Sequence, residues 1–292
     1  MIVFELLKAI FYGVLEGITE WLPISSTGHI ILLSELLPLS FDRLYGEEFA
    51  AEFFEMFEVV IQLGAICAVA VIFFGRLNPF TSRNKDFLDR EKLKLWVKIA
   101  VACMPSAAAG IFLQVCFPAL LDSLYTPTVV AAMLIVYGIL FIVVERVRNK
   151  KSTRDHAVED VSCVRAFAIG CFQALSIVPG TSRSGATVLG ARCLGVSRSA
   201  AAEFSFFMAI PTMLGASAIK ALGFFKYVSE SGTTVPVFSI VILITALVSA
   251  FATSLAAIKF LMSYVSKKGF QAFGVYRIIL GSIVIIYFAF IK

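Results

Sequence analysis

Two acidic residues four positions apart open the densest polar cluster of this chain. Glu16 and Glu20 share one face of a helix if the segment is helical. Two carboxylates inside a membrane are costly and need a partner. Their oxygens suit a hard divalent cation such as Mg²⁺ or Ca²⁺, which would bridge to phosphate oxygens. Acids exposed to water at a helix end are the alternative, but Pro23 ends the helix just after Glu20, at the supposed midplane.

Hydroxyl side chains follow this proline. Ser25, Ser26 and Thr27 would begin the next helix and cap its free backbone N–H groups. The same N–H groups, together with the positive end of the helix dipole, form an anion site, although capping alone is the simpler interpretation. His29 comes directly after them. A lone histidine in a membrane is often only packed, but beside acids and hydroxyls it is a candidate nucleophile, base or acid.

A second polar cluster, "VPGTSRSGAT", lies at residues 178–187. Arg183 presents a planar fork of donors that matches phosphate, and an unpaired arginine deep in a membrane is a poor structural device. Ser182, Ser184 and Thr187 add hydroxyl donors beside it. Carboxylates for a metal, two helix starts for anions, one arginine and one histidine together favour phosphoryl chemistry on a lipid-borne phosphate.

The composition places these clusters in a membrane. Of 292 residues, 59% are hydrophobic and 15% charged, and the mean hydropathy is +0.91, whereas soluble domains carry about 25% charge. The chain is therefore predicted to be a polytopic membrane protein with lipids around it and no nucleic-acid partner. Its six cysteines form no CxxC pair and are expected to be buried free thiols.

Six apolar stretches are long enough to cross a bilayer, which takes about 20 residues each. They lie near 53–74, 95–115, 127–145, 200–225, 236–260 and 272–291. Two further apolar regions, 2–34 and 163–195, are interrupted by a proline and small polar residues. Irregular backbone at membrane depth survives only where protein or water covers it. These two regions are therefore predicted to be re-entrant helix–loop–helix hairpins.

The two interrupted regions resemble each other. "GVLEGITEWLPISSTG" (13–28) aligns with "GCFQALSIVPGTSRSG" (170–185) with one gap, which pairs Pro23 with Pro179 and Ser26 with Ser182. Downstream, "LGAICAVAVIFF" (63–74) aligns with "LGASAIKALGFF" (214–225). Each unit would hold one hairpin and three spans, so the second unit is inverted relative to the first. We predict one all-α membrane domain over 1–292, with repeats near 1–150 and 160–292 and a site at the midplane.

Basic residues set the predicted orientation. One side of the membrane holds Arg76, Arg83, Lys85, Arg90, Lys92, Lys94, Arg146, Arg148, Lys150, Lys151, Arg154, Arg165, Arg198, Lys259, Lys267 and Lys268. The other side holds Lys8, Arg43, Lys226 and Lys292. The positive-inside rule assigns the first side to the cytoplasm. Both termini and the open end of the first hairpin then face outside, and we expect the site to form a cleft open to the outer face.

At this point the chain resembles a known family. "LEGITEWLPISSTGH" and "PGTSRSGAT" look like the two signature motifs of undecaprenyl-diphosphate phosphatases of the bacitracin-resistance type. "FEVVIQLGAI" (57–66), "GVSRSAAAEFSF" (195–206) and "YRIILG" (276–281) are similar to that family as well. The resemblance implies a divalent-metal-dependent hydrolase of the bacterial inner membrane. It would convert undecaprenyl diphosphate to undecaprenyl phosphate, recycle the lipid carrier for cell-wall synthesis and confer bacitracin resistance. A homodimer is left open.

The resemblance also implies roles for individual residues. Glu16 and Glu20 would serve the metal and acid–base chemistry, and His29 would be catalytic. Ser25, Ser26 and Thr27 would line the diphosphate site, and Arg183 would clamp phosphate together with Ser182 and Thr187. Neither the motifs nor the residues decide the nucleophile: Ser26 and His29 are both favoured over a metal-bound water.

Two other functions fit parts of the pattern. An inverted-repeat transporter or flippase for a phosphorylated lipid explains the fold equally well, but transport needs no acid–base pair. A second family of lipid phosphatases uses two histidines and an SRxxxxxHxxxD element. This chain has the SR of that element with no following His or Asp, and its other histidine, His156, lies in a basic loop expected to be solvated in the cytoplasm.

Overall fold

The computed structural model describes residues 2–39, 46–80, 88–149 and 157–290. Its extended structure within those ranges is confined to one isolated bridge between Phe80 and Leu88. Six helical segments in them are long and apolar enough to cross a membrane. They are α4 with α5 (Glu47–Val60 and Gln62–Ile72), α7 (Arg90–Cys116), α9 (Pro127–Arg148), α12 (Arg198–Ser231), α13 (Val237–Lys268) and α14 (Gln271–Phe290). The predicted all-α polytopic class is confirmed.

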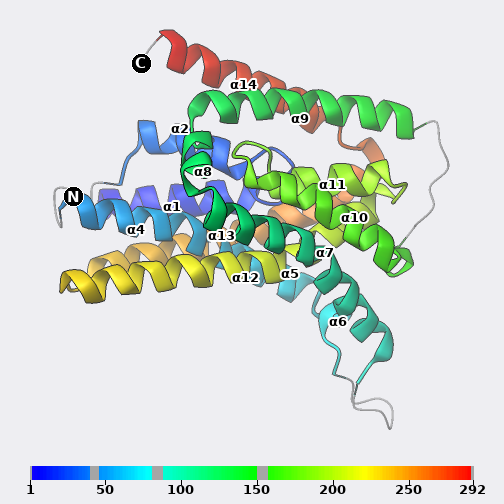
Figure 1. Cartoon of the computed structure of the whole chain (residues 1–292), viewed down its shortest axis with the longest axis horizontal. Coiled ribbons are helices and arrows are strands. Elements are labelled where there is room, and N and C mark those ends of the chain that lie inside the picture. Colours follow the sequence, from blue (N-terminus) through cyan, green and yellow to red (C-terminus); the bar gives the residue numbers. More distant parts are fainter. Residues whose placement is uncertain (1, 40–45, 81–87, 150–156, 291–292) are drawn as a thin grey trace.

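The two interrupted regions each form a pair of shorter helices. The first pair is α1 (Ile2–Thr19) and α2 (Ser26–Leu36), and the second is α10 (Cys163–Ala174) and α11 (Arg183–Cys193). Each pair turns at a loop near the middle of the molecule, and the open ends of the two pairs point to opposite ends (Figure 1). This geometry is what re-entrant hairpins require, and their placement in a bilayer stays a prediction.

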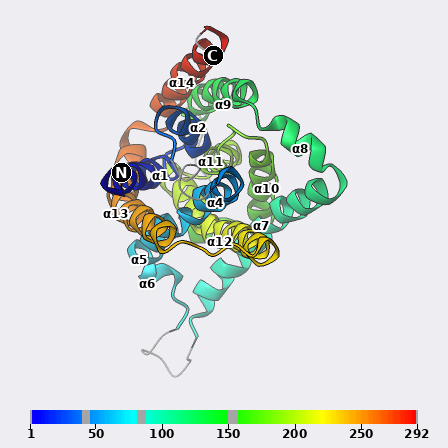
Figure 2. The ribbon, with the colours of Figure 1, turned by 90° about the vertical axis from the view of Figure 1, so that its left-hand side faces the viewer.

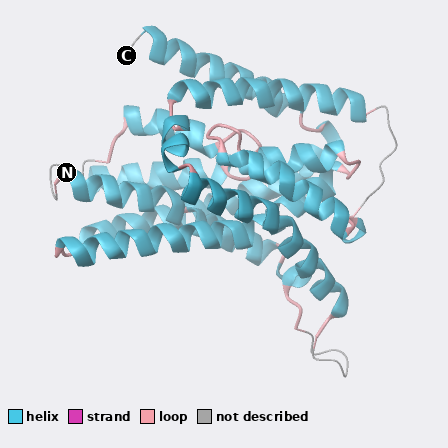
Figure 3. Ribbon diagram, in the orientation of Figure 1, coloured by secondary structure: helices cyan, strands magenta, loops and turns pink. Residues whose placement is uncertain are grey.

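Short elements complete the described chain. They are α6 (Phe74–Leu77), α8 (Pro118–Leu124) and the 3₁₀ turns η1 (Val158–Asp160) and η2 (Leu175–Ile177). Seen from the end at which the chain begins, α4 and α11 lie near the centre, with the long spans around them (Figure 2). The loops between α1 and α2 and between α10 and α11 lie near the middle of the bundle, among the helices (Figure 3).

The first arm of each hairpin packs closely on a span of the opposite half. At Gly13 in α1, an added Cβ would lie 2.3 Å from the carbonyl oxygen of Ala246 in α13. At Gly170 in α10, it would lie 2.0 Å from the carbonyl oxygen of Ala102 in α7. Only glycine permits such approach of two backbones. Gly13 and Gly170 are the first residues of the two aligned segments, so this is the arrangement that an inverted repeat requires; the repeat itself stays a prediction.

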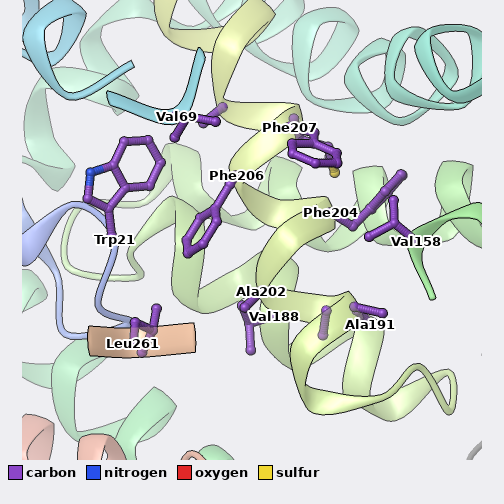
Figure 4. Close-up of a cluster of buried hydrophobic side chains, with 14 of the residues drawn as sticks. Trp21, Val69, Val158, Val188, Ala191, Ala202, Phe204, Phe206, Phe207 and Leu261 are labelled. Carbon is purple, nitrogen blue, oxygen red and sulfur yellow. The ribbon is translucent and has the colours of Figure 1, made fainter. Parts of the chain in front are cut away.

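A buried aromatic core supports the two loops from one side. Trp21, which lies in the first loop, packs edge-on against Phe206 of α12, with ring centroids 5.2 Å apart. Phe204 and Phe207 of the same helix are also buried (Figure 4). Edge-to-face contacts of this kind contribute about 0.5–1.5 kcal/mol beyond the area that they bury. The first loop is thereby fixed to a span of the second half.

The outer surface of the bundle is apolar. Val115, Ile219 and Val237 are each at least 70% exposed, as expected for side chains that face lipid rather than water. The prediction of buried cysteines is wrong: all six thiols are free, but only Cys103 is even partly buried. In a membrane protein, a cysteine in an apolar segment can face either the protein core or the lipid. The apolar sequence around a cysteine therefore does not tell a buried thiol from one that faces lipid.

Candidate active site

Both loops end in a serine with the same unusual backbone. Ser25 has φ +74° and Ser182 has φ +69°, and they are the only residues other than glycine with positive φ in the described chain. Each serine caps the helix that follows: the Ser25 hydroxyl accepts from Gly28 N at 3.4 Å, and the Ser182 hydroxyl accepts from Gly185 N at 3.1 Å. Such backbone costs about 1–3 kcal/mol and persists where the surroundings enforce it. By its place in the structure, Ser182 therefore corresponds to Ser25, and not to Ser26 as the sequence alignment had it.

A chain of short hydrogen bonds joins the two loops. Ser26 Oγ donates to Glu20 Oε2 at 2.9 Å, and Arg183 Nη2 donates to Glu20 Oε1 at 2.7 Å. The sequence motifs that carry Glu20 and Arg183 are 163 residues apart. The structure therefore brings together three of the residues predicted to be catalytic, one carboxylate between a hydroxyl and a guanidinium.

These groups face a cavity of about 230 Å³ between the starts of α2 and α11. Among the residues predicted for the site, Glu20, Ser26, Thr27, Ser182 and Arg183 line it. The remaining lining residues are Gln62, Tyr125, Ser176, Ile177, Pro179, Gly180, Thr212, Met213 and Ala216. Two helices of 11 residues start at this cavity. Their free N–H groups and dipoles make it suited to an anion.

Arg183 is held in place by more than Glu20. Its Nη1 donates to the carbonyl oxygen of Ser205 at 2.8 Å, and its guanidinium lies 5.9 Å from the centre of the Trp21 ring. Its Nε is buried and has no hydrogen-bond partner. A buried N–H without a partner costs about 1–3 kcal/mol, so this donor suits an acceptor that arrives with a ligand.

Glu16, one helical turn before Glu20 in α1, is fully buried. Neither of its carboxyl oxygens has a hydrogen-bond partner, and the charged groups that act on it are Glu20, Glu58 and Arg183. No group of three or more histidine, cysteine, aspartate or glutamate side chains positioned to hold a metal ion occurs in the described part of the chain. Two orphaned carboxyl oxygens in the interior nevertheless fit a cation, because a bound cation would satisfy them.

Three predicted substrate-binding residues lie just outside the cavity lining. Ser25 is buried as a cap. Ser184 Oγ donates to the backbone oxygen of Glu20 at 2.9 Å. Thr187 Oγ1 lies 2.6 Å from Ser205 Oγ, and Ser205 is the residue whose carbonyl accepts from Arg183. Ser184 and Thr187 thus contact the backbone of two residues that line the cavity, Glu20 and Arg183, whereas Ser25 contacts the residues that follow it in α2.

His29 points away from the cavity. Its Nδ1 lies 2.7 Å from the carbonyl oxygen of Ser25, and its Nε2 lies 2.7 Å from the hydroxyl of Tyr276 in α14. The carbonyl can only accept, so Nδ1 carries a proton and a neutral ring would accept from Tyr276 through Nε2. Ser26, rather than His29, is hydrogen-bonded to the carboxylate in this structure. His156 lies outside the described residues.

The sequence reasoning missed Arg277, the residue that binds both loops. This guanidinium is fully buried in α14. It donates to Pro23 O in the first loop at 3.2 Å, and to Gly180 O and Thr181 O in the second loop at 2.8 and 3.0 Å. A charge-assisted hydrogen bond contributes about 1.5–3 kcal/mol. An arginine inside a predicted span was the available signal.

We expect Arg277→Lys to lower kcat/KM by about 10- to 100-fold, because the compact ammonium lacks the planar fork whose two Nη groups reach the two loops. Steady-state kinetics on the purified variant would measure this. Arg192→Lys is the matched control: Arg192 is also buried, but it binds Glu145 at the far end of α11. That control should lower the melting temperature and leave kcat/KM within about threefold. Equal kinetic losses in both variants would show that Arg277 serves stability alone.

The fold and this site define a class: a helical membrane protein with a cavity between two helix starts whose donors suit an anion. The family model of the bacitracin resistance protein BacA matches residues 9–283. A protein named undecaprenyl-diphosphatase from Enterococcus faecalis is 49% identical over 97% of this chain and 96% of its own length. Proteins of the same name from Lachnoclostridium phytofermentans (48% identical, 97% of each chain) and Streptococcus equi subsp. equi (49%, 99% of each chain) are similar too. The chain belongs to the BacA family.

Proposed function

We propose that this chain hydrolyses undecaprenyl diphosphate to undecaprenyl phosphate and phosphate. The observation that carries the proposal is the hydrogen-bonded cluster of Glu20, Ser26 and Arg183 at a cavity between two helix starts. Relatives named undecaprenyl-diphosphatase cover nearly the whole chain and support the choice of substrate. The product is a lipid carrier for cell-wall synthesis, and its recycling would confer bacitracin resistance.

The geometry favours Ser26 as the nucleophile. Its hydroxyl already donates to Glu20 at 2.9 Å, so the carboxylate can take the proton as the oxygen attacks. A bond forms between Ser26 Oγ and the terminal phosphorus, and the anhydride P–O bond breaks to release undecaprenyl phosphate. Glu20 passes the Ser26 proton to the departing phosphate oxygen and is ionised again. It then accepts a proton from the water that attacks the phosphoserine, and gives that proton to Ser26 Oγ as phosphate leaves. Ser26 returns with its proton.

Arg183 and the two helix starts would stabilise the charge on the transferred phosphoryl group. Arg183, whose Nε–H has no partner, and the first residues of α2 and α11 line one cavity. Phosphoryl transfer places little demand on covalent chemistry and a large one on positioning and charge. The orphaned carboxyl of Glu16, together with Glu20, would hold a divalent cation, which would supply positive charge to the phosphate oxygens.

We expect chelation of divalent cations to abolish turnover, and added Mg²⁺ or Ca²⁺ to restore it. Glu16→Gln replaces one of the two orphaned carboxyl oxygens with an amide nitrogen, which cannot bind a cation. It should raise the metal concentration needed for half-maximal activity by about 10- to 100-fold. Titration of each metal into chelated protein gives this value, and calorimetry of metal binding without substrate gives an independent readout. Full activity in excess chelator would rule out the metal.

Phosphate release in detergent distinguishes hydrolysis from the transporter alternative. Micelles have no two compartments, so a flippase produces no signal there, whereas a hydrolase releases phosphate and undecaprenyl phosphate in equal amounts. We expect both products from the purified protein, and neither from an Arg183→Ala variant purified in parallel. Lipid movement between leaflets of proteoliposomes, with no phosphate release in either system, would establish the transporter instead.

We further propose that the chain lies in the bacterial inner membrane with its cavity open to the outer face. The first turn of α7 and the last turn of α9, which carry Arg90 and Arg148, lie at the end of the bundle opposite to the open end of the first hairpin (Figure 1), which supports this orientation. Tyr125, in the turn between α8 and α9, lines the cavity. That turn joins two elements at the end assigned to the outside.

Two exposed serines allow a matched test of orientation. Ser231 ends α12 at the proposed outer end, and Ser266 lies near the end of α13 at the proposed cytoplasmic end. In a background without native cysteines, a membrane-impermeant thiol reagent applied to spheroplasts should label Ser231→Cys and not Ser266→Cys. Thr27→Cys, in the cavity lining, should be labelled from the same side as Ser231→Cys. The reverse pattern would mean that the cavity opens to the cytoplasm.

A further inference from the structure

A largely apolar groove runs from the candidate active site along α7 and α12. Its inner part is a cavity of about 400 Å³ lined by Arg183, Gly110, Ile219 and Gly215, among others. Its outer part is a cavity of about 470 Å³ lined mostly by apolar residues, including Ile219 and Gly223, and also by the charged side chains of Glu52, Glu55 and Lys220. The two parts share Gly110, Ile111 and Ile219, so they adjoin. We refer to both together as the α7–α12 groove.

The inner part of the groove also adjoins the phosphate-suited cavity. Arg183, Ser176, Ile177, Thr212 and Ala216 line both. A group bound to Arg183 therefore lies at the junction, with donors on one side and an apolar surface on the other. A molecule that reaches from one cavity into the other must be polar at one end and apolar along the rest of its length.

Small residues keep the groove open. An added Cβ at Gly110 in α7, or at Gly215 or Gly223 in α12, would meet no atom within 4 Å. These glycines therefore serve no close contact between helices, unlike Gly13 and Gly170. Glycine inside a helix costs about 1 kcal/mol relative to alanine, so three open glycines along one groove need another reason. Space for a ligand is such a reason.

We propose that the α7–α12 groove holds the polyprenyl chain of the substrate while its diphosphate lies at Arg183. The inference rests on the proposed function and adds where the lipid chain lies and which residues select for its length. The groove opens between spans whose outward side chains, such as Ile219 and Val115, are at least 70% exposed. A chain in the groove can thus continue into the surrounding lipid.

The groove would act on positioning more than on affinity. Lipid tails are as apolar as the groove lining, so moving the chain between them gains little hydrophobic free energy. Packing against α7 and α12 instead restricts the chain and aligns the diphosphate with Ser26, and small misplacements of reacting atoms cost large factors in rate. The first isoprene units after the diphosphate would occupy the inner part, and later units the outer part.

A leucine at an outer or an inner glycine tests this order. Gly223→Leu should lower kcat/KM for undecaprenyl diphosphate by about tenfold, and for farnesyl diphosphate, which has three isoprene units, by less than about twofold. Gly215→Leu, close to Arg183, should lower both. Gly75→Leu in α6, where a Cβ also meets nothing, is the matched control and should change neither. Equal effects of Gly223→Leu on both substrates, or no effect on either, would overturn the groove assignment.

The outcomes separate this inference from the proposed function. If the unaltered protein hydrolyses neither diphosphate, both fail. If it hydrolyses both and Gly223→Leu shows no dependence on chain length, the groove assignment alone fails. A photoreactive undecaprenyl diphosphate analogue with its label on a middle isoprene unit provides a second measurement on the unaltered chain. Adducts on α7 and α12 are expected, and adducts confined to other helices would overturn the assignment.

Discussion

Glu20→Gln is expected to lower kcat by about 10²- to 10⁴-fold while the protein still folds. The amide keeps the size of the side chain and can still accept hydrogen bonds from Ser26 and Arg183 through one oxygen. It cannot take the proton of the Ser26 hydroxyl, which donates to Glu20 Oε2 in the structure. Initial rates of phosphate release on the variant, with the melting temperature measured in parallel, would show a loss of chemistry without a loss of fold.

The pairing of Glu20 with Ser26 also predicts the rate of a double variant. Ser26→Ala removes the nucleophile, so the double variant should be no slower than the worse single variant, because residues that act as a unit are not additive. Ser182→Ala, which removes the cap of α11 rather than of α2, is the matched serine control. It should cost about 0.5–2 kcal/mol of stability and a smaller part of kcat. Losses that multiply in the double variant would contradict the base–nucleophile pairing.

Arg183→Lys is expected to lower kcat/KM by about 10- to 100-fold, although the charge is retained. The guanidinium holds Glu20 and the Ser205 carbonyl with its two Nη groups and leaves Nε–H unpartnered beside the cavity. A lysine offers a point charge and cannot make all three interactions at once. Each charge-assisted bond contributes about 1.5–3 kcal/mol. A competitive-inhibition series with inorganic pyrophosphate would show the same loss in binding.

Ser205→Ala is the control for this prediction. It removes the hydroxyl that contacts Thr187 but keeps the backbone carbonyl that accepts from Arg183. We expect about 1 kcal/mol of lost stability and a change in kcat/KM below about threefold. If Arg183→Lys also changes kcat/KM by less than about threefold, Arg183 is a structural ion-pair partner of Glu20 and does not bind phosphate.

Much of the fold follows from the hydropathy of the chain. Six long apolar stretches and two stretches broken at Pro23 and Pro179 are features of local sequence, and each has its described helices. The bounds differ, most of all in α13, which continues to Lys268 rather than ending near residue 260. The order of the cap residues did not follow, because Ser25 and Ser182 adopt positive φ. A side chain in this conformation is disfavoured locally, so only the surrounding structure could reveal which serine begins each helix.

The sequence predicted the reactive groups of the site but not all of their partners. Glu20, Ser26 and Arg183 belong to the two motifs, and the meeting of the motifs follows if both loops lie at the midplane. The partner of His29 and the role of Arg277 depend on side chains of α14. The sequence assigned no role in the site to any residue of that helix. Such contacts span more than 90 residues of sequence. The local sequence pattern therefore identified the reactive groups, but it identified the residues that hold them in place less well.

A structure with a non-hydrolysable undecaprenyl diphosphate analogue, in which a methylene group replaces the bridging oxygen, is the most direct test that the two loops form one phosphatase site. The terminal phosphonate is expected between the starts of α2 and α11, within hydrogen-bond distance of Arg183 and close to Ser26 Oγ. The first isoprene units are expected between α7 and α12. A phosphonate bound anywhere else, with Arg183 making only its present contacts to Glu20 and Ser205, would contradict the assignment of this cavity as the active site.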